Sequence, residues 1–138
     1  MLYEKSCGAA VFLREEGRRL YLVEVMRQGH ISLCKGHVEG SETETETARR
    51  EILEETGLEV SLIDGFRETI RYSPYPGCSK EVVFFLAETS SGETVAQQSE
   101  VSSIRFLPLK EALDQLTYED DRRILRAADR FLSQTRDR

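Results

Sequence analysis

Five consecutive apolar residues, Val82-Val-Phe-Phe-Leu86, constrain the fold of this chain more than any other feature. A strand covered on one face alternates apolar and polar side chains, whereas an unbroken apolar run is typical of a strand buried on both faces. A sheet that contains such a strand needs a layer of structure on each side. We therefore expect a central strand at 82–86 and a mixed α/β domain with helices packed on the faces of its sheet.

The segments around this strand supply the other elements of such a domain. Residues 7–13 and 19–26 are rich in β-forming residues and are joined by a polar turn ending at Gly17, which predicts a hairpin. Apolar residues at helical spacing predict two closing helices, at 109–116 and 118–131. Further extended segments are expected at 31–35, 60–72 and 103–107.

A helix is predicted to begin near Thr43 and to end at Gly57. Thr43 and Glu46 have the spacing of a capping box, in which the threonine side chain accepts a backbone N–H and the glutamate reaches back. Gly57 suits the left-handed position that ends many helices. The segment 36–41, which has two glycines, is predicted to be a loop in front of this helix.

Length and composition fit a single soluble domain spanning residues 1–138. With 39% hydrophobic and 32% charged residues, the chain can bury a core and is not typical of a disordered protein. No segment approaches the roughly 20 apolar residues of a membrane span, so no membrane partner is expected. Three widely spaced cysteines, an odd number without a C-x-x-C pair, predict free thiols and a cytoplasmic location.

The net charge of −6 restricts the possible partners. General nucleic-acid binding depends on Lys and Arg that neutralise phosphates, so an acidic chain is a poor candidate for it. If this protein handles phosphate groups, it needs local basic residues or a bridging metal ion. A nucleic acid is therefore not an expected partner, with the exception of an RNA 5′ end.

The predicted helix carries an unusual concentration of acid, including Glu51, Glu54 and Glu55. Counting 100° per residue from Ala48, these three glutamates fall at about 300°, 240° and 340°, beside the apolar stripe of Ala48 and Ile52. Clustered carboxylates at the border of a core repel one another, and their oxygen atoms suit a hard cation such as Mg²⁺ or Mn²⁺. The alternative is a charged solvent face with incidental salt bridges.

The spacing around this helix resembles the Nudix box, G-x5-E-x7-R-E-U-x-E-E-x-G-U, where U is aliphatic. Gly36, Glu42 and the segment 50–58 match every defined position. This resemblance implies a Nudix fold, an α/β/α sandwich around a mixed β-sheet. It also implies hydrolysis of a nucleoside diphosphate linked to another group, with divalent metals bound by the loop and helix.

The resemblance also implies roles for individual residues. Arg50 would orient a box glutamate, and Glu42 would brace the loop against the start of the helix. Because a polyphosphate must be neutralised and a water activated, Mg²⁺ or Mn²⁺ is the expected cofactor. The implied metal ligands are the carbonyl oxygen of Gly36 and the side chains of Glu51, Glu54 and Glu55.

Leu33-Cys-Lys-Gly-His-Val-Glu39 resembles the L-P-K-G-H-V-E segment of the asymmetrical diadenosine tetraphosphate hydrolases, a Nudix branch. Those enzymes cleave dinucleoside tetraphosphates into a triphosphate and a monophosphate. The resemblance implies phosphate contacts for Lys35 and His37, although a purely structural hydrogen bond is equally open for His37. Cys34 departs from the branch, which usually has proline there, and the loop thereby loses a fixed φ.

Three further segments resemble the same branch. Tyr72, followed by Lys80, would stack on a base while the lysine holds phosphate, and Tyr118 would form a second stacking platform. Glu100, which precedes the predicted strand 103–107, would be an extra metal ligand or the base. The alternatives are an ordinary strand residue, a core anchor and a loop charge for Tyr72, Tyr118 and Glu100, respectively.

We therefore predict a metal-dependent pyrophosphohydrolase that cleaves dinucleoside polyphosphates, such as diadenosine tetraphosphate, to ATP and AMP. Its proton acceptor would be Glu51, Glu54 or Glu100, its partner a small-molecule nucleotide, and its state a monomer or homodimer. Alternative substrates are (d)NTPs, RNA 5′ ends and other nucleoside diphosphate derivatives. A different class of protein, a non-catalytic nucleotide-sensing Nudix domain, commonly has an eroded box, whereas the box of this chain is complete.

Overall fold

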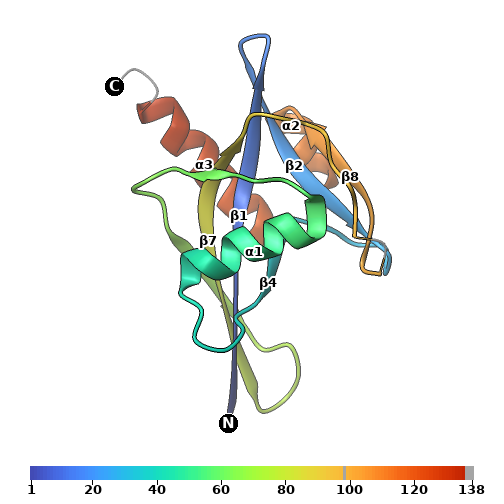
Figure 1. Cartoon of the computed structure of the whole chain (residues 1–138). Helices are drawn as coiled ribbons and strands as arrows, with labels where there is room; N and C mark the ends of the chain where they lie inside the picture. The colour runs from blue at the N-terminus through green and yellow to red at the C-terminus, as the bar shows by residue number, and fades with distance from the viewer. Residues whose placement is uncertain (98, 136–138) are drawn as a thin grey trace.

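The computed structural model describes residues 1–97 and 99–135, which form three layers (Figure 1). Within these residues, eight strands make one mixed sheet, in which β1 (Leu2–Glu15) runs parallel to β7 (Cys78–Thr89) and the other pairs are antiparallel. Helix α1 (Glu44–Thr56) lies on one face of the sheet and α3 (Glu119–Thr135) on the other. The predicted α/β/α sandwich around a mixed sheet is confirmed.

The two longest strands, β1 and β7, form the centre of the sheet. The predicted strand at 82–86 is the middle of β7, where Val82, Val83 and Phe84 are inaccessible to solvent because protein covers both faces. β2 (Arg18–Met26) follows β1 through the predicted hairpin and also pairs with β8 (Val101–Leu107). The short strands are β3 (Ile31–Ser32), β4 (Cys34–His37), β5 (Ser61–Leu62) and β6 (Glu68–Tyr72).

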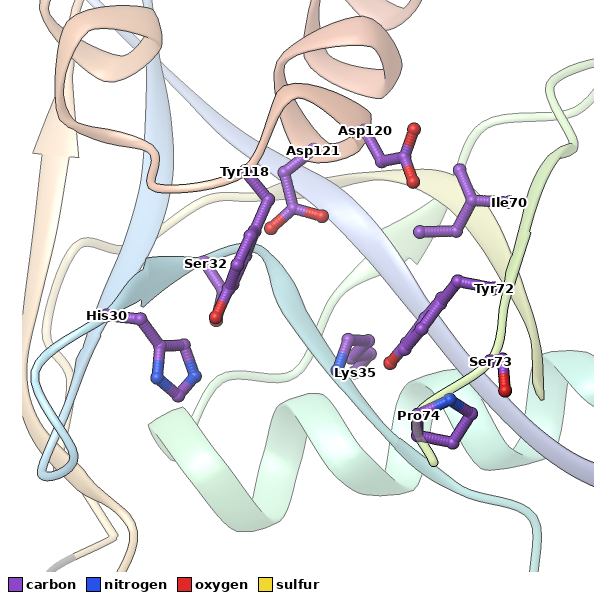
Figure 2. A pocket seen from close by; sticks show the side chains of 10 residues that line it. All are labelled: His30, Ser32, Lys35, Ile70, Tyr72, Ser73, Pro74, Tyr118, Asp120 and Asp121. Atoms are coloured by element: carbon purple, nitrogen blue, oxygen red, sulfur yellow. The ribbon is translucent and has the colours of Figure 1, made fainter. Parts of the chain in front are cut away.

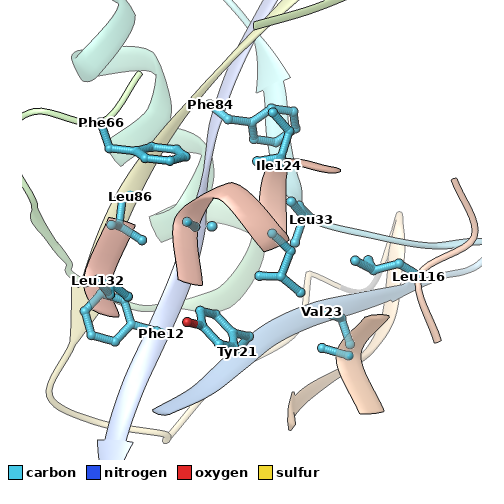
Figure 3. Packing of buried hydrophobic residues seen from close by; sticks show 14 of the residues in the cluster. Phe12, Tyr21, Val23, Leu33, Phe66, Phe84, Leu86, Leu116, Ile124 and Leu132 are labelled. Atoms are coloured by element: carbon cyan, nitrogen blue, oxygen red, sulfur yellow. The ribbon is translucent and has the colours of Figure 1, made fainter. Parts of the chain in front are cut away.

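Each face of the sheet has its own hydrophobic core, because alternate residues of a strand point to opposite sides. The larger core lies beneath α3 and α2 (Leu109–Gln115) and is shown in Figure 3; its members include Phe12, Tyr21, Phe84 and Leu125. On the other face, Ile52 and Ala48 of α1 pack against smaller apolar clusters. The sheet therefore separates two layers of side chains, and the predicted site residues lie on both faces.

Helix α1 begins and ends as its sequence predicts. The side chain of Thr43 accepts the backbone N–H of Glu46, the side chain of Glu46 accepts the N–H of Thr43, and Gly57 ends the helix with a φ of 77°. The preceding loop starts later than predicted, because Gly36 and His37 belong to β4 and pair with β1. This pairing holds the start of the box against the centre of the sheet.

The two C-terminal helices also form near their predicted positions, and the link between them is tied to β3. The N–H of Ile31 donates to Thr117 Oγ1 at 2.8 Å, and the N–H of Thr117 donates to the carbonyl of Ile31 at 3.0 Å. These bonds place the start of α3 next to β3. Within the part of the chain that the structure describes, no helix combines the length and the hydropathy needed to cross a membrane.

Candidate active site

The three box glutamates lie on one side of α1 and differ in depth. Glu55 is 4% exposed, the side chain of Glu51 is 12% exposed, and that of Glu54 is 51% exposed. This gradient agrees with their predicted angles, since Glu55 is nearest to the apolar stripe and Glu54 is farthest from it. The cluster therefore reaches from the solvent to the core.

Gly36 allows the carboxylate of Glu51 to lie directly against the backbone of β4. A Cβ atom added to Gly36 would be 1.9 Å from Glu51 Cδ and 2.0 Å from Glu51 Oε1. No side chain can occupy that space unless the carboxylate moves away. The first glycine of the box is thus explained by a close approach between strand and helix.

Arg50 joins the glutamates of the helix to the loop in front of it. Its Nη1 donates to Glu51 Oε2 at 2.7 Å and to Glu54 Oε2 at 3.0 Å. Its Nε donates to Glu42 Oε2 at 2.6 Å, and its Nη2 donates to the carbonyl of His37 at 2.8 Å. A planar guanidinium with five donors can hold several acceptors in fixed directions, as the predicted orienting role requires.

Glu42 fixes the loop to the first turns of the helix. Its Oε1 accepts the N–H of Glu39 at 3.0 Å and the hydroxyl of Thr47 at 2.9 Å. The hydrogen bond from Arg50 is the main cause that lowers the pKa of Glu42 to about 2, so this carboxylate stays ionised at neutral pH. These contacts agree with the predicted bracing role.

One carboxylate of the cluster, Glu24 on β2, was not among the residues predicted from the sequence. Its carboxyl group is 1% exposed and is hydrogen-bonded to that of Glu55, which also accepts the thiol of Cys34 at 3.1 Å. Burial raises the pKa of both carboxyl groups. One signal could have found it, because Glu24 interrupts an apolar strand on the same face as the buried Leu22.

The donor set of this cluster fits a divalent cation. Arg50 pairs with Glu51 and Glu54, but within the described residues Glu55 has no ion pair with a basic side chain. A buried carboxylate without a positive partner is costly, and a cation would supply the missing charge. Glu51, Glu54, Glu55 and the backbone oxygen of Gly36 offer only oxygen, the donor that Mg²⁺ and Mn²⁺ prefer.

A pocket of about 500 Å³ lies on the α3 side of β4. Tyr72 and Tyr118 stand on opposite sides of it, with the side chain of Lys35 between them (Figure 2). Both tyrosines are partly exposed, at 40% and 54%, so neither is a core residue. Lys35 alternates with Cys34 and Gly36 along β4, which places the strand itself between this pocket and the carboxylates.

Lys80 lies beside this pocket, on β7. It is opposite Tyr72 in the antiparallel pairing of β6 and β7, so the two residues lie side by side on neighbouring strands. Lys80 is 8% exposed, and its burial, followed by the charge of Lys35, lowers its pKa. The two lysines are therefore near enough to repel each other, and an anion between them would relieve that repulsion.

Two predicted site residues, His37 and Glu100, do not line this pocket. The side chain of His37 is exposed, with Nε2 3.4 Å from Glu4 Oε1, and does not line the pocket. Glu100 is exposed in the turn before β8, where its carbonyl accepts the N–H of Arg27. The pocket instead contains His30, whose ring centroid is 5.9 Å from that of Tyr118. No pattern in the sequence singled out His30.

The NUDIX domain pattern matches residues 5–128 of this chain. The chain belongs to the Nudix family. The complete box and the carboxylate cluster that it forms agree with this assignment, so the predicted membership of the Nudix family is confirmed. Members of the family generally use divalent metal ions and act on small nucleotide substrates.

Proteins similar to this Nudix chain are named for hydrolysis of different substrates. An asymmetrical bis(5′-nucleosyl)-tetraphosphatase of Mus musculus is 35% identical over 143 residues, which cover 95% of this chain and 97% of that protein. An 8-oxo-(d)GTP phosphatase of Mycolicibacterium smegmatis is 40% identical over 95 residues, which cover 69% of this chain but 29% of that protein. The aligned region likewise spans only 56% of a relative from Mycobacterium tuberculosis.

The fold of this Nudix chain is also similar to that of solved structures. An Ap4A hydrolase of C. elegans superposes with a TM-score of 0.86 over 95% of this chain and 98% of that chain. The two sequences are 24% identical, so this likeness bears on the fold alone. The arrangement of layers described above is therefore that of the family.

Proposed function

We propose that this Nudix hydrolase cleaves dinucleoside polyphosphates in a divalent-metal-dependent reaction, with diadenosine tetraphosphate giving ATP and AMP. The observation that carries this proposal is the pair of tyrosines that face each other across a pocket beside the carboxylate cluster. The similarity to an asymmetrical tetraphosphatase, which covers nearly the whole length of both proteins, supports it.

The pocket suits one nucleoside end of such a substrate. Its volume of about 500 Å³ lies within the usual range for small-molecule sites. In this proposal the base is stacked between Tyr72 and Tyr118, because an aromatic ring binds the flat face of any base. A dinucleotide gains more from such a platform than inorganic polyphosphate, which has no base to stack.

The phosphate chain would leave the pocket along β4. Lys35 lies between the two tyrosines, and Lys80 lies nearby on β7, so positive charge lines the start of this path. Gly36, the next residue after Lys35, lies against Glu51. A polyphosphate held by the lysines therefore approaches the carboxylates at the point where strand and helix meet. His37 remains a further phosphate ligand in this proposal.

Mg²⁺ or Mn²⁺ held by Gly36, Glu51, Glu54 and Glu55 would neutralise the polyphosphate and lower the pKa of a water molecule. The chain itself must fix the geometry, and Arg50 does so by holding Glu51 and Glu54 together. The attacking water must also lose a proton to a carboxylate. The acceptors proposed for this proton are Glu51, Glu54 and Glu100, and Glu100 is also proposed as an extra metal ligand.

A panel of substrates with Mg²⁺ or Mn²⁺ tests this proposal, with products separated by ion exchange. Diadenosine tetraphosphate, dNTPs, 8-oxo-dGTP and 5′-triphosphorylated RNA represent the competing substrate classes. We expect ATP and AMP in equal amounts from diadenosine tetraphosphate, and exclusive cleavage of dNTPs would contradict the proposal. Tyr118→Ala should raise KM, whereas Tyr3→Ala, which changes a tyrosine outside the pocket, should not.

The same assay tests the metal ligands. Glu51→Gln and Glu55→Gln keep the shape of the side chain but lose the charge, so each should lose most of its turnover with Mg²⁺. Near-native turnover in either variant would show that the carboxylate is not needed. Nucleotide binding by the wild-type protein without hydrolysis under Mg²⁺ or Mn²⁺ would support a nucleotide-sensing domain instead.

A second candidate substrate is 8-oxo-(d)GTP. The observation that favours it is the 40% identity to an 8-oxo-(d)GTP phosphatase, although the aligned region is only 29% of that protein. The pocket with two tyrosines would hold the base of a mononucleotide equally well. The two candidates differ in the leaving group, so faster hydrolysis of 8-oxo-dGTP than of diadenosine tetraphosphate would favour this one.

A further inference from the structure

A buried cluster of three potential metal ligands contains the box glutamate Glu55 and two residues that the proposed reaction does not use, Glu24 and Cys34. Glu24 comes from β2, Cys34 from β4 and Glu55 from α1, so three elements converge here. One ligand atom from each residue lies within 4.8 Å of the others, and the three residues are 1%, 0% and 4% exposed. Two carboxyl groups and a thiol are an expensive combination to bury.

One carboxylate oxygen of this cluster is buried although it has no hydrogen-bond partner among the described residues. Within the described residues, Glu24 Oε2 forms no hydrogen bond and is inaccessible to solvent. Apart from Cys34 and Glu55, the side chains that flank it include the apolar Leu22 on its own strand and Ile104 opposite it on β8, and Ser32 is opposite it on β3. A buried carboxylate oxygen that lacks a donor is a position at which a cation restores the lost interaction.

We propose that Glu24, Cys34 and Glu55 form a second cation site, which takes a thiophilic divalent ion such as Zn²⁺. The donor set decides the class of ion, because Mg²⁺ prefers oxygen ligands whereas thiolate sulfur selects softer ions. Cys34 Sγ is 3.1 Å from Glu55 Oε1, close to the spacing of about 3.5 Å between donors on a tetrahedral zinc ion.

Binding at this site exchanges a proton for the cation. The Sγ–H bond of Cys34 breaks, its proton leaves to solvent, and the sulfur lone pair forms the bond to the ion. Any proton that the two carboxyl groups share is released in the same way. Glu55 would then serve both this site and the proposed magnesium site, so an ion bound here competes for a ligand of the catalytic cluster.

The thiol is peculiar to this chain relative to the sequence pattern that it resembles. Cys34 occupies the position at which that pattern usually has proline, a residue that offers no side-chain ligand. The protein has two other buried free thiols, Cys7 and Cys78, and neither belongs to such a cluster within the described residues. These two cysteines provide matched controls within the same protein.

Titration of the metal-free protein with Cd²⁺ tests the proposal, because a cadmium–thiolate bond produces charge-transfer absorption in the ultraviolet. We expect this absorption to reach its maximum at one equivalent of Cd²⁺ in the wild-type protein and in the variants Cys7→Ala and Cys78→Ala. Cys34→Ala should lose it, and Glu24→Gln should bind Cd²⁺ about 10-fold more weakly or worse. Absorption that survives in Cys34→Ala would overturn the proposal.

A second measurement needs no variant, so it holds even if Cys34→Ala fails to fold. X-ray absorption of the zinc-loaded wild-type protein should show one sulfur at about 2.3 Å from the ion. A zinc ion surrounded only by oxygen or nitrogen would overturn the proposal.

The second cation site rests on Glu55 but not on the proposed reaction, and different results would contradict the two proposals. Sulfur bound to the ion, without hydrolysis of any nucleotide, would remove the proposed function and leave the second site. Hydrolysis with Mg²⁺ by a protein whose zinc has no sulfur ligand would do the reverse. Inhibition of that hydrolysis by Zn²⁺, weakened at least about 10-fold in Cys34→Ala, is expected if both hold.

Discussion

At the scale of single residues, Gly36 has no room for an added Cβ atom while Glu51 keeps its position. In Gly36→Ala the new methyl group would overlap the carboxylate of Glu51, so this carboxylate must leave its place between β4 and Arg50. We expect kcat with Mg²⁺ to fall about 100-fold, while the variant still folds at a cost of about 1–3 kcal/mol. Steady-state hydrolysis and urea unfolding measure the two effects.

A substitution in the loop that follows β4 is the control for this prediction. Gly40 has a φ of 54° and no atom within 4 Å of an added Cβ, and asparagine tolerates that backbone conformation. Gly40→Asn should therefore keep near-native turnover. If both variants lost activity equally, loop perturbation rather than the displacement of Glu51 would be the cause.

Asp121 should make stability depend on pH. Burial raises its pKa to about 6, although the hydrogen bond from the N–H of Leu33 lowers the pKa in part. The folded state therefore binds this proton more tightly than the unfolded state. Its contribution to the free energy of unfolding is fully present below about pH 4 and is lost as the pH rises through about 6.

Asp121→Asn should remove this dependence, because an amide can accept the same hydrogen bond without becoming charged. We expect the variant to exceed the wild-type free energy of unfolding by about 1–3 kcal/mol at about pH 7.5 and to match it at about pH 4. Urea unfolding at both pH values measures this, with the exposed Asp120→Asn as the control. An equal difference at both pH values would contradict the assignment.

At the scale of elements, Arg50 holds the loop and α1 in one arrangement. Arg50→Lys keeps the charge, but an ammonium group cannot reach Glu42, Glu51 and Glu54 together as the guanidinium does. We expect kcat/KM to fall about 10- to 100-fold, with Mg²⁺ binding weakened by a similar factor. Arg49→Lys, on the exposed side of the same helix, should change neither quantity.

The elements themselves were largely predictable, because local chemistry specifies their ends. The capping box of Thr43 and the left-handed Gly57 bound α1 in the sequence and in the structure. The apolar run at 82–86 indicated a strand buried on both faces, but not that β7 continues to Thr89, because its outer residues depend on pairing with β1. Short strands were harder to predict from the sequence, because β3 and β5 have two residues each and so show no repeating pattern.

The site was predictable only where one motif contains it. Glu51, Glu54 and Glu55 share a helix, so their convergence follows from helical geometry. Glu24 and His30 reach the site through long-range packing, and the only local sign of it is the charge of Glu24 within the apolar strand β2. The paired tyrosines are intermediate, because resemblance indicated each of them but only the fold places them across one pocket.

At the scale of the whole molecule, the sheet places the proposed metal ligands on one face and the proposed nucleotide pocket on the other. Helices α1 and α3 cover opposite faces of the sheet (Figure 1). The box carboxylates lie on the α1 face, whereas Tyr72, Tyr118 and Lys35 line the pocket on the α3 face. Alternation along one strand places Lys35 in the pocket and Gly36 at the carboxylates. In the proposed function, an extended polyphosphate would connect the pocket on one face with the carboxylates on the other.

This arrangement predicts that divalent cations stabilise the folded protein. A cation that binds only the folded state adds about 2.7 kcal/mol when its concentration is 100 times Kd, which corresponds to a rise in Tm of roughly 5–10 °C for a chain of this size. Thermal unfolding after treatment with EDTA, with and without saturating Mg²⁺ or Mn²⁺, measures the shift. Glu55→Gln should reduce it, whereas the exposed Glu111→Gln on α2 should leave it unchanged. A Tm that no divalent cation alters would contradict a cation site among these carboxylates.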